Sequence, residues 1–187
     1  MRLELAALVF LCAAAAQPVA FAGDGPADEP KGYRTDNYRA PTPATLEGAK
    51  VLTAAEAAVL WRSGKAAFID VLPQPPRPAN LPEGTLWREK PRFSIPGSIW
   101  LPDTGYGALN PAMEGYFRSG LQQAAGEDRG KMLVFFCLKT CWHSWNAAKR
   151  AVSLGYANVA WYPDGTDGWS AGALPLEAVT PVPRPTG

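Results

Sequence analysis

The sequence predicts an α/β fold in which a mostly parallel central sheet carries helices on both faces. Helix-like segments alternate with short apolar runs, which is the pattern of parallel strands joined by helical crossovers. The runs are nearly continuous in apolar residues, as expected for strands that are buried on both faces. In such sheets, ligands bind beyond the carboxyl ends of the strands. The residues that follow each strand are therefore the first place to look for chemistry.

The first 22 residues have the features of a secretory signal peptide. An apolar stretch that is too short to span a bilayer precedes Ala20-Phe21-Ala22, a small-x-small cleavage site. Removal of residues 1–22 would take Cys12 with it and leave Cys137 and Cys141 as the cysteines of a mature protein in an oxidising compartment. A net charge of +1 gives no electrostatic footprint for nucleic acid. We expect no membrane partner once the signal has been removed.

Residues 23–50 are expected to form an extended arm that lies across the domain. The segment has aromatic residues but no helical or strand periodicity. It contains two tyrosine–arginine pairs, Tyr33-Arg34 and Tyr38-Arg39. They could grip a ligand or partner, or the tyrosines could pack on the core while the arginines stay in solvent.

The compact domain is predicted over residues 51–176. Thr53 and Glu56 have the spacing of a capping box, which predicts a helix to about Trp61. Residues 66–71 form a short apolar run suited to a buried strand. Residues 72–92 are too rich in proline for regular structure, and Trp87 within them indicates that this loop packs.

The second half of the domain repeats the alternation of strands and helices. A tight turn and a short strand are expected in 95–102, and Asn110-Pro111 predicts the start of a helix that ends near Ala125. The remaining elements in order are a strand at 131–136, a helix at 144–154, a strand at 158–162, a turn at 163–168, a docking segment at 169–176 and a proline-rich tail at 177–187, expected to be frayed.

The candidate site is the loop that joins the strand ending at Phe136 to the helix expected from Ser144. A thiol at a helix N-terminus has a lowered pKa, because the helix dipole and free N–H groups favour the thiolate. The Cys137-x3-Cys141 spacing puts the two Cα atoms about 6 Å apart in helical geometry, within reach of a disulfide. Our hypothesis is a reversible disulfide in which Cys137 reacts and Cys141 resolves. The alternative is a static structural bridge.

The other residues of this loop are assigned supporting roles. Leu138, Lys139, Thr140 and Trp142 would offer backbone N–H groups to a thiolate or persulfide, beside Ser144. His143 is the one histidine of the chain, and it could serve as a base, complete a copper or zinc site with Cys137 and Cys141, or simply be a satisfied histidine.

The sequence leaves the roles of three further residues undecided. Trp142 and Trp145 are three positions apart and could wall the cysteine pocket or form a docking patch, with core packing as the alternative. Asp70, at a strand end, could orient the loop through hydrogen bonds.

The order of the motifs resembles a rhodanese domain. The matching pieces are Phe68-Ile69-Asp70-Val71, Ile95-Pro96-Gly97-Ser98, Val134-Phe135-Phe136-Cys137, Gly155-Tyr156-Ala157-Asn158-Val159 and Gly165-Thr166-Asp167-Gly168-Trp169. The resemblance implies a rhodanese-like fold with Cys137 at the catalytic position. Active rhodaneses surround the persulfide with a loop that contains glycine and arginine. The segment from Leu138 to Trp142 has neither, and it gains Cys141, which counts against simple thiosulfate sulfurtransferase activity.

A narrower resemblance is to the CXXCW motif proteins associated with catabolism that depends on pyrroloquinoline quinone (PQQ). It is carried by Cys137-Leu138-Lys139-Thr140-Cys141-Trp142, by residues 144–150 and by residues 162–169. The resemblance implies a periplasmic protein accessory to PQQ-dependent alcohol oxidation, with a quinoprotein dehydrogenase or cytochrome c as partner. No cofactor is expected. The alternatives are a non-catalytic module that binds such a partner and a copper-handling protein.

Overall fold

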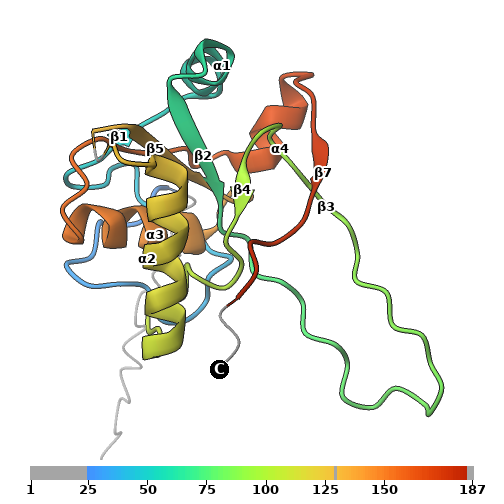
Figure 1. The fold of residues 1–187 in the computed structure, drawn as a ribbon. Coiled ribbons are helices and arrows are strands. Elements are labelled where there is room, and N and C mark those ends of the chain that lie inside the picture. Colours follow the sequence, from blue (N-terminus) through green and yellow to red (C-terminus); the bar gives the residue numbers. More distant parts are fainter. Residues whose placement is uncertain (1–24, 129, 185–187) are drawn as a thin grey trace, which may run out of the picture.

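A five-stranded parallel sheet forms the centre of the computed structural model, which describes residues 25–128 and 130–184 (Figure 1). The strand order is β1-β6-β5-β2-β4, and every neighbouring pair is parallel. The strands are β1 (Lys50–Val51), β2 (Ala66–Asp70), β4 (Ile99–Trp100), β5 (Met132–Phe136) and β6 (Val159–Trp161). The register places Asp70 opposite Phe136 at the carboxyl ends of β2 and β5. This edge therefore presents Asp70 and Cys137 side by side.

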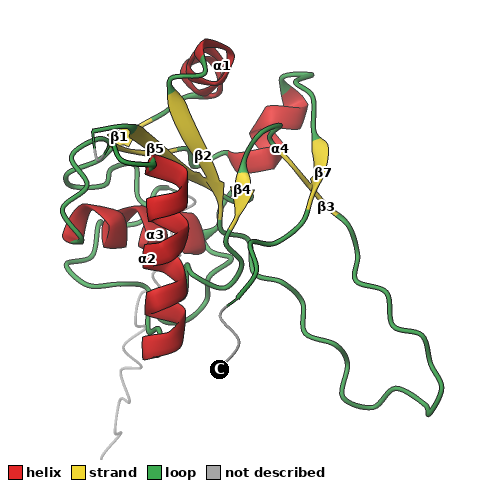
Figure 2. Cartoon of the chain, in the orientation of Figure 1, coloured by secondary structure: helices red, strands yellow, loops and turns green. Residues whose placement is uncertain are grey.

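Helices cover both faces of the sheet (Figure 2). They are α1 (Ala54–Ser63), α2 (Pro111–Ala125), α3 (Trp142–Ser153) and α4 (Gly165–Ala171). Alternate residues of the strands point to opposite faces, so that Phe135 packs with α2 and α3 while Phe136 packs with α1 and α4. The α/β fold with a mostly parallel sheet is thereby confirmed.

The helix caps follow the local sequence. The Thr53 side chain accepts a hydrogen bond from the Glu56 backbone, and Glu56 accepts one in return from the Thr53 backbone, so the predicted capping box is present. At the start of α2, the Asn110 side chain accepts a hydrogen bond from the Met113 N–H at 2.9 Å. Both helices begin where the caps predict.

The segment predicted as a turn at 163–168 mostly belongs to α4. Its glycines have low helix propensity, so the sequence gives no helical signal there. The helix is fixed instead by tertiary packing: Trp169 is fully buried and meets Trp61 and Tyr162 edge to face. Packing of one indole outweighs the local preference.

The segment after Leu176, expected as a frayed tail, continues the structure. Residues Glu177–Val179 form β7, which pairs antiparallel with β3 (Arg92–Ser94) in a two-stranded sheet. This pairing fixes the end of the proline-rich loop, because β3 begins at the last loop residue.

The proline-rich loop between β2 and β3 projects away from the sheet (Figure 1). The prediction that Trp87 packs is wrong: it is among the exposed large side chains, and its neighbour Leu86 is 86% exposed. No helix in the described part of the chain is long and apolar enough to cross a membrane. The expected signal peptide lies outside the described residues.

Candidate functional site

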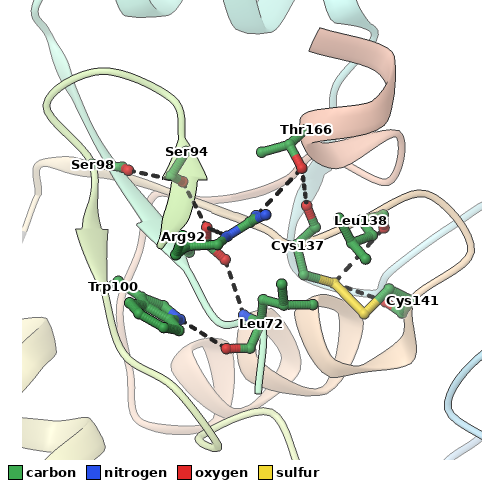
Figure 3. Close-up of polar contacts among 10 residues, drawn as sticks. Leu72, Arg92, Ser94, Ser98, Trp100, Cys137, Leu138, Cys141 and Thr166 are labelled. Atoms are coloured by element: carbon green, nitrogen blue, oxygen red, sulfur yellow. Dashed lines mark hydrogen bonds and ion pairs between the residues drawn. A yellow bond between two sulfur atoms is a disulfide. The ribbon is translucent and has the colours of Figure 1, made fainter. Parts of the chain in front are cut away.

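Cys137 and Cys141 form a disulfide at the carboxyl edge of the sheet (Figure 3). Cys137 follows directly on β5, and Cys141 is the N-cap residue of α3. Their Cα atoms are 6.5 Å apart, within the normal range for a disulfide. Both side chains are buried. The helix starts two residues earlier than predicted, so that the bridge joins the end of the strand directly to the helix N-terminus.

The backbone on the Cys137 side of the loop is held by the start of α4. The Cys137 carbonyl accepts hydrogen bonds from the Thr166 N–H at 3.0 Å and from the Thr166 hydroxyl at 3.3 Å. The Lys139 N–H donates to the Asp167 carboxylate at 3.0 Å. Gly165 has a φ of +52°, and a Cβ there would collide with the Cys137 carbonyl. The predicted supporting N–H of Lys139 thus already has a protein partner.

The remaining loop residues lie toward solvent. Lys139 and Thr140 are exposed, and Leu138 is half-buried and bridges to Gly165. Thr140 adopts a φ of +52°, and its hydroxyl donates to the Lys139 carbonyl. The loop therefore reaches the surface at its tip while both sulfurs stay beneath it.

Asp70 anchors a buried polar network, and its partners Leu72, Arg92 and Ser94 are labelled near the disulfide in Figure 3. Its carboxylate accepts hydrogen bonds from Arg92 at 2.7 Å, from the Ser94 hydroxyl at 2.6 Å and from the Leu72 N–H at 2.9 Å. Burial raises the pKa of Asp70, and the Arg92 charge opposes that effect. Arg92 in turn donates to the Thr166 hydroxyl, which bonds the Cys137 carbonyl. Arg92 and Thr166 thus connect Asp70 to the Cys137 carbonyl, and the orienting role of Asp70 stays a prediction.

His143 packs against the Cys141 side of the disulfide. Its Nδ1 lies 3.5 Å from Cys141 Sγ, and its ring stacks on Tyr38 and meets Tyr106 edge to face. Burial, helped by the Arg39 charge, lowers the pKa of His143 to about 4. Its Nε2 is buried without a hydrogen-bond partner. The ring is therefore neutral at physiological pH.

Trp142 and Trp145 are core residues that hold the N-terminal arm. Trp142 Nε1 donates to the Pro41 carbonyl at 3.0 Å, and Trp145 Nε1 donates to the Thr45 carbonyl at 3.1 Å. Both indoles are buried, so the interpretation as a docking patch is wrong. The Ser144 hydroxyl donates to the Cys141 carbonyl and closes the first turn of α3.

A cavity of about 620 Å³ opens beside the disulfide. Cys141, His143 and Leu138 line it, and Cys137 does not. Arg39, Lys90 and Arg92 contribute positive charge to its wall, against one carboxylate from Asp167; the other lining residues are Leu72, Pro73, Pro75, Pro91, Phe93, Trp100, Thr166, Ser170 and Leu176. The bases of the proline-rich loop thus form one side of a cationic cavity.

The sequence reasoning missed part of this cavity. Nothing in the local pattern around Arg92 or Thr166 marks them as partners of the site, because the contacts join segments distant in the chain. The sequence marks the Tyr38-Arg39 pair as a possible grip on a ligand, and the structure places Tyr38 on His143 and the exposed Arg39 at the cavity.

The described residues contain no group of three or more His, Cys, Asp or Glu side chains placed to hold a metal ion. Both cysteines of the alternative ligand set are engaged in the disulfide. The copper hypothesis stays a prediction from the sequence.

No protein-family model matches the chain, and no curated protein matches it. Among solved structures it is similar to a thiosulfate sulfurtransferase from Pseudomonas aeruginosa, with 19% identity and a TM-score of 0.49 over 71% of this chain and 21% of that one. It is also similar to the polysulfide-sulfur transferase homodimer from Wolinella succinogenes, with 16% identity and a TM-score of 0.44 over 70% and 79% of the two chains. A third is EanB in a persulfide state with ergothioneine, with 22% identity and a TM-score of 0.48 over 77% and 34%. At these values, what those proteins act on does not carry over to this chain.

Proposed function

We propose that this chain is a rhodanese-like thiol protein whose Cys137–Cys141 pair passes disulfide or sulfur equivalents to a partner. The observation that carries the proposal is the disulfide itself, which lies at the carboxyl edge of a parallel sheet and at the wall of a cationic cavity. The bridge closes a very short loop, so that its contribution to stability through chain entropy is small. A purely structural purpose therefore accounts poorly for its position.

The chemistry needs no group beyond the sulfur atoms. A thiolate that attacks the disulfide forms a mixed disulfide and releases one cysteine as a thiolate, and a second thiolate completes the reduction. Hydrosulfide as the nucleophile gives a persulfide on one cysteine and a thiolate on the other. The same pair can therefore serve redox exchange and sulfur carriage.

We further propose a periplasmic location and an accessory role in PQQ-dependent alcohol oxidation, with a quinoprotein dehydrogenase or cytochrome c as partner. The support for this finer proposal is the sequence resemblance of residues 137–142, 144–150 and 162–169. Growth on an alcohol that requires a quinoprotein dehydrogenase would test it: deletion of the coding region should slow that growth and leave growth on a sugar unchanged.

The exchange proposal is tested on the purified protein by mass spectrometry after alkylation. In a series of thiol–disulfide buffers, the pair should move from fully oxidised to fully reduced across one two-electron midpoint, and hydrosulfide should add a single sulfur atom. A pair that stays oxidised in excess glutathione, while the protein remains folded, would sink the proposal.

A second candidate function is partner binding without chemistry. It is favoured by the proline-rich loop, which presents Leu86 and Trp87 to solvent. The Cys137→Ser/Cys141→Ser protein would then support growth in cells as well as the wild type. The Leu86→Ser/Trp87→Ser protein would not, and the opposite result would favour the exchange proposal.

A further inference from the structure

We infer that Cys141, and not Cys137, is the sulfur through which the pair exchanges. A sulfur anion that enters the cavity attacks Cys141 Sγ, and Cys137 leaves as the thiolate. This order reverses the assignment made from the sequence. The inference rests on the proposed exchange function and adds to it the point of entry and the charge of the incoming group.

Access to the two sulfurs is unequal. Both side chains are buried, but Cys141 lines the cavity together with His143, whereas Cys137 is not part of the cavity wall. Attack at sulfur requires the nucleophile to approach along the S–S axis from the far side of the sulfur that it attacks. The cavity wall includes Cys141, whereas Cys137 continues directly from β5 and its carbonyl is held by the start of α4.

The backbone around Cys137 is fixed, so that its sulfur can act as the leaving group of the exchange and still remain close to Cys141. The Cys137 carbonyl is bonded by the Thr166 N–H and hydroxyl, and Gly165 packs directly against it. The released sulfur stays next to Cys141, the N-cap residue of the 12-residue helix α3, whose dipole favours a thiolate; the carbonyl oxygens of Cys141 and Leu138 lie 3.5 and 3.8 Å from this sulfur. The buried thiolate is therefore positioned to attack the mixed disulfide and close the cycle.

The cavity favours an anionic nucleophile. Arg39 and Lys90 line the cavity together with Arg92, whose charge is paired with Asp70, and Asp167 is the carboxylate on the wall. The positive charge raises the local concentration of thiolates and hydrosulfide. His143 touches Cys141 as a neutral ring, so that it adds no positive charge of its own to this field at physiological pH.

The bonds and electrons balance in two steps. A thiolate RS⁻ forms a bond to Cys141 Sγ, the Cys137–Cys141 bond breaks, and its electron pair leaves with the Cys137 sulfur. A second thiolate then attacks the outer sulfur, which releases RSSR and the Cys141 thiolate. Two thiolates are oxidised and the protein disulfide takes up two electrons. With hydrosulfide, the first step ends at a Cys141 persulfide.

The decisive experiment traps the first intermediate in the wild-type protein. The oxidised protein is mixed with glutathione for milliseconds to seconds and quenched with acid, free thiols are alkylated, and the peptides are mapped by mass spectrometry. We expect glutathione on Cys141 and the alkyl group on Cys137, in at least tenfold excess over the reverse pattern. Glutathione on Cys137 would overturn the inference while leaving the exchange function intact. A mixed disulfide on neither cysteine would overturn the exchange function and this inference with it.

Single-cysteine variants give an independent measurement. Cys137→Ser leaves the Cys141 thiol, and Cys141→Ser leaves the Cys137 thiol. The rate of each thiol with an anionic aromatic disulfide is divided by the rate of the same variant in denaturant, and this ratio should be at least ten times larger for Cys141. Equal or reversed ratios would contradict the inference. Because both variants lose the same bridge, circular dichroism of each checks that the comparison is between folded proteins.

The charge preference is tested at Arg39, which is exposed at the cavity. Arg39→Gln should slow reduction by glutathione roughly threefold or more at low salt, and should leave reduction by neutral 2-mercaptoethanol almost unchanged. Arg62→Gln, on the last turn of α1, is the matched control and should change neither rate. Equal slowing of both reductants at Arg39 would show that the cavity does not select by charge.

Discussion

At the scale of single residues, Gly165 is the position where the site tolerates least change. Its φ of +52° disfavours any side chain, and a Cβ would push against the Cys137 carbonyl. Gly165→Ala should therefore lower the free energy of unfolding by about 2 kcal/mol or more.

Gly172 at the end of the same helix is a natural control. Its φ is −80°, and an added Cβ would meet its neighbours only at ordinary contact distances. We expect Gly172→Ala to stay within about 0.5 kcal/mol of wild type in urea unfolding. If Gly165→Ala lost as little unfolding free energy as Gly172→Ala, the Cys137 carbonyl would have moved aside at almost no cost.

His143 makes the stability of the protein depend on pH. Its folded-state pKa of about 4 lies below its ordinary value of 6.5, so the unfolded chain binds the proton more readily between these values. The contribution of the neutral ring is complete above pH 6.5 and is lost as the pH falls through 4, by up to about 3 kcal/mol.

The same property can be measured directly, because the chain has one histidine. Its ring protons in an NMR titration should show a midpoint near 4, and the pH dependence of unfolding should weaken in His143→Gln between pH 4 and 6.5. A midpoint close to 6.5 would mean that the ring is not buried against Tyr38 and Cys141.

At the scale of elements, the sequence identified those parts whose signals are local. The capping box at Thr53, the Asn110 cap and the apolar runs of β2, β5 and β6 could all be read from neighbouring residues. The position of Cys137 followed from the end of β5. These elements placed both cysteines at the correct edge of the sheet.

The sequence could not supply what depends on distant contacts. A glycine-rich segment becomes α4 because Trp169 packs against Trp61 and Tyr162, and β7 forms because β3 is there to pair with it. The cavity that Cys141 lines is also formed by Arg39 and Lys90, which come from segments far from the cysteine loop in the chain. For the same reason, helix geometry alone favoured Cys137 as the reacting thiol.

The proline-rich loop should be removable without loss of the fold. The Gln74 side chain donates to Glu89 at 2.6 Å, so that the two bases of the loop already touch. Replacement of residues 77–87 by a four-residue Gly-Ser turn should change the free energy of unfolding by no more than about 1 kcal/mol, because closure entropy varies slowly with loop length.

Trp169→Ala serves as the reference for the loop replacement. It removes a fully buried indole and should lower the free energy of unfolding by about 3–5 kcal/mol in the same urea titration. A loss of that size from the loop replacement would show that the loop contributes to the core after all.

At the scale of the whole molecule, the N-terminal arm and the domain form one unit. The arm receives the two indole hydrogen bonds from α3, and the Tyr38 carbonyl accepts the Trp142 N–H at 3.0 Å. A protein that starts at Leu46 should lose at least about 2 kcal/mol of unfolding free energy, since these bonds contribute about 1 kcal/mol each and apolar contact is lost as well.

The exposed indoles should shift tryptophan emission to longer wavelength in that truncated protein. Truncation before Gly32 removes none of these acceptors and serves as the control, with unchanged emission. Unchanged emission and stability in the longer truncation would show that the arm rests on α3 without stabilising it.

The projecting loop also divides the chain in a way that invites fragment complementation. It follows β2, which lies between β5 and β4, so a cut at the tip would leave β2 on one piece and both of its neighbours on the other. The first piece would carry Tyr38 and the second His143 and both cysteines. Two separately expressed halves would have to associate before the cavity beside the disulfide could form, because both halves contribute to its wall. The proposed thiol exchange would then depend on the association of the halves.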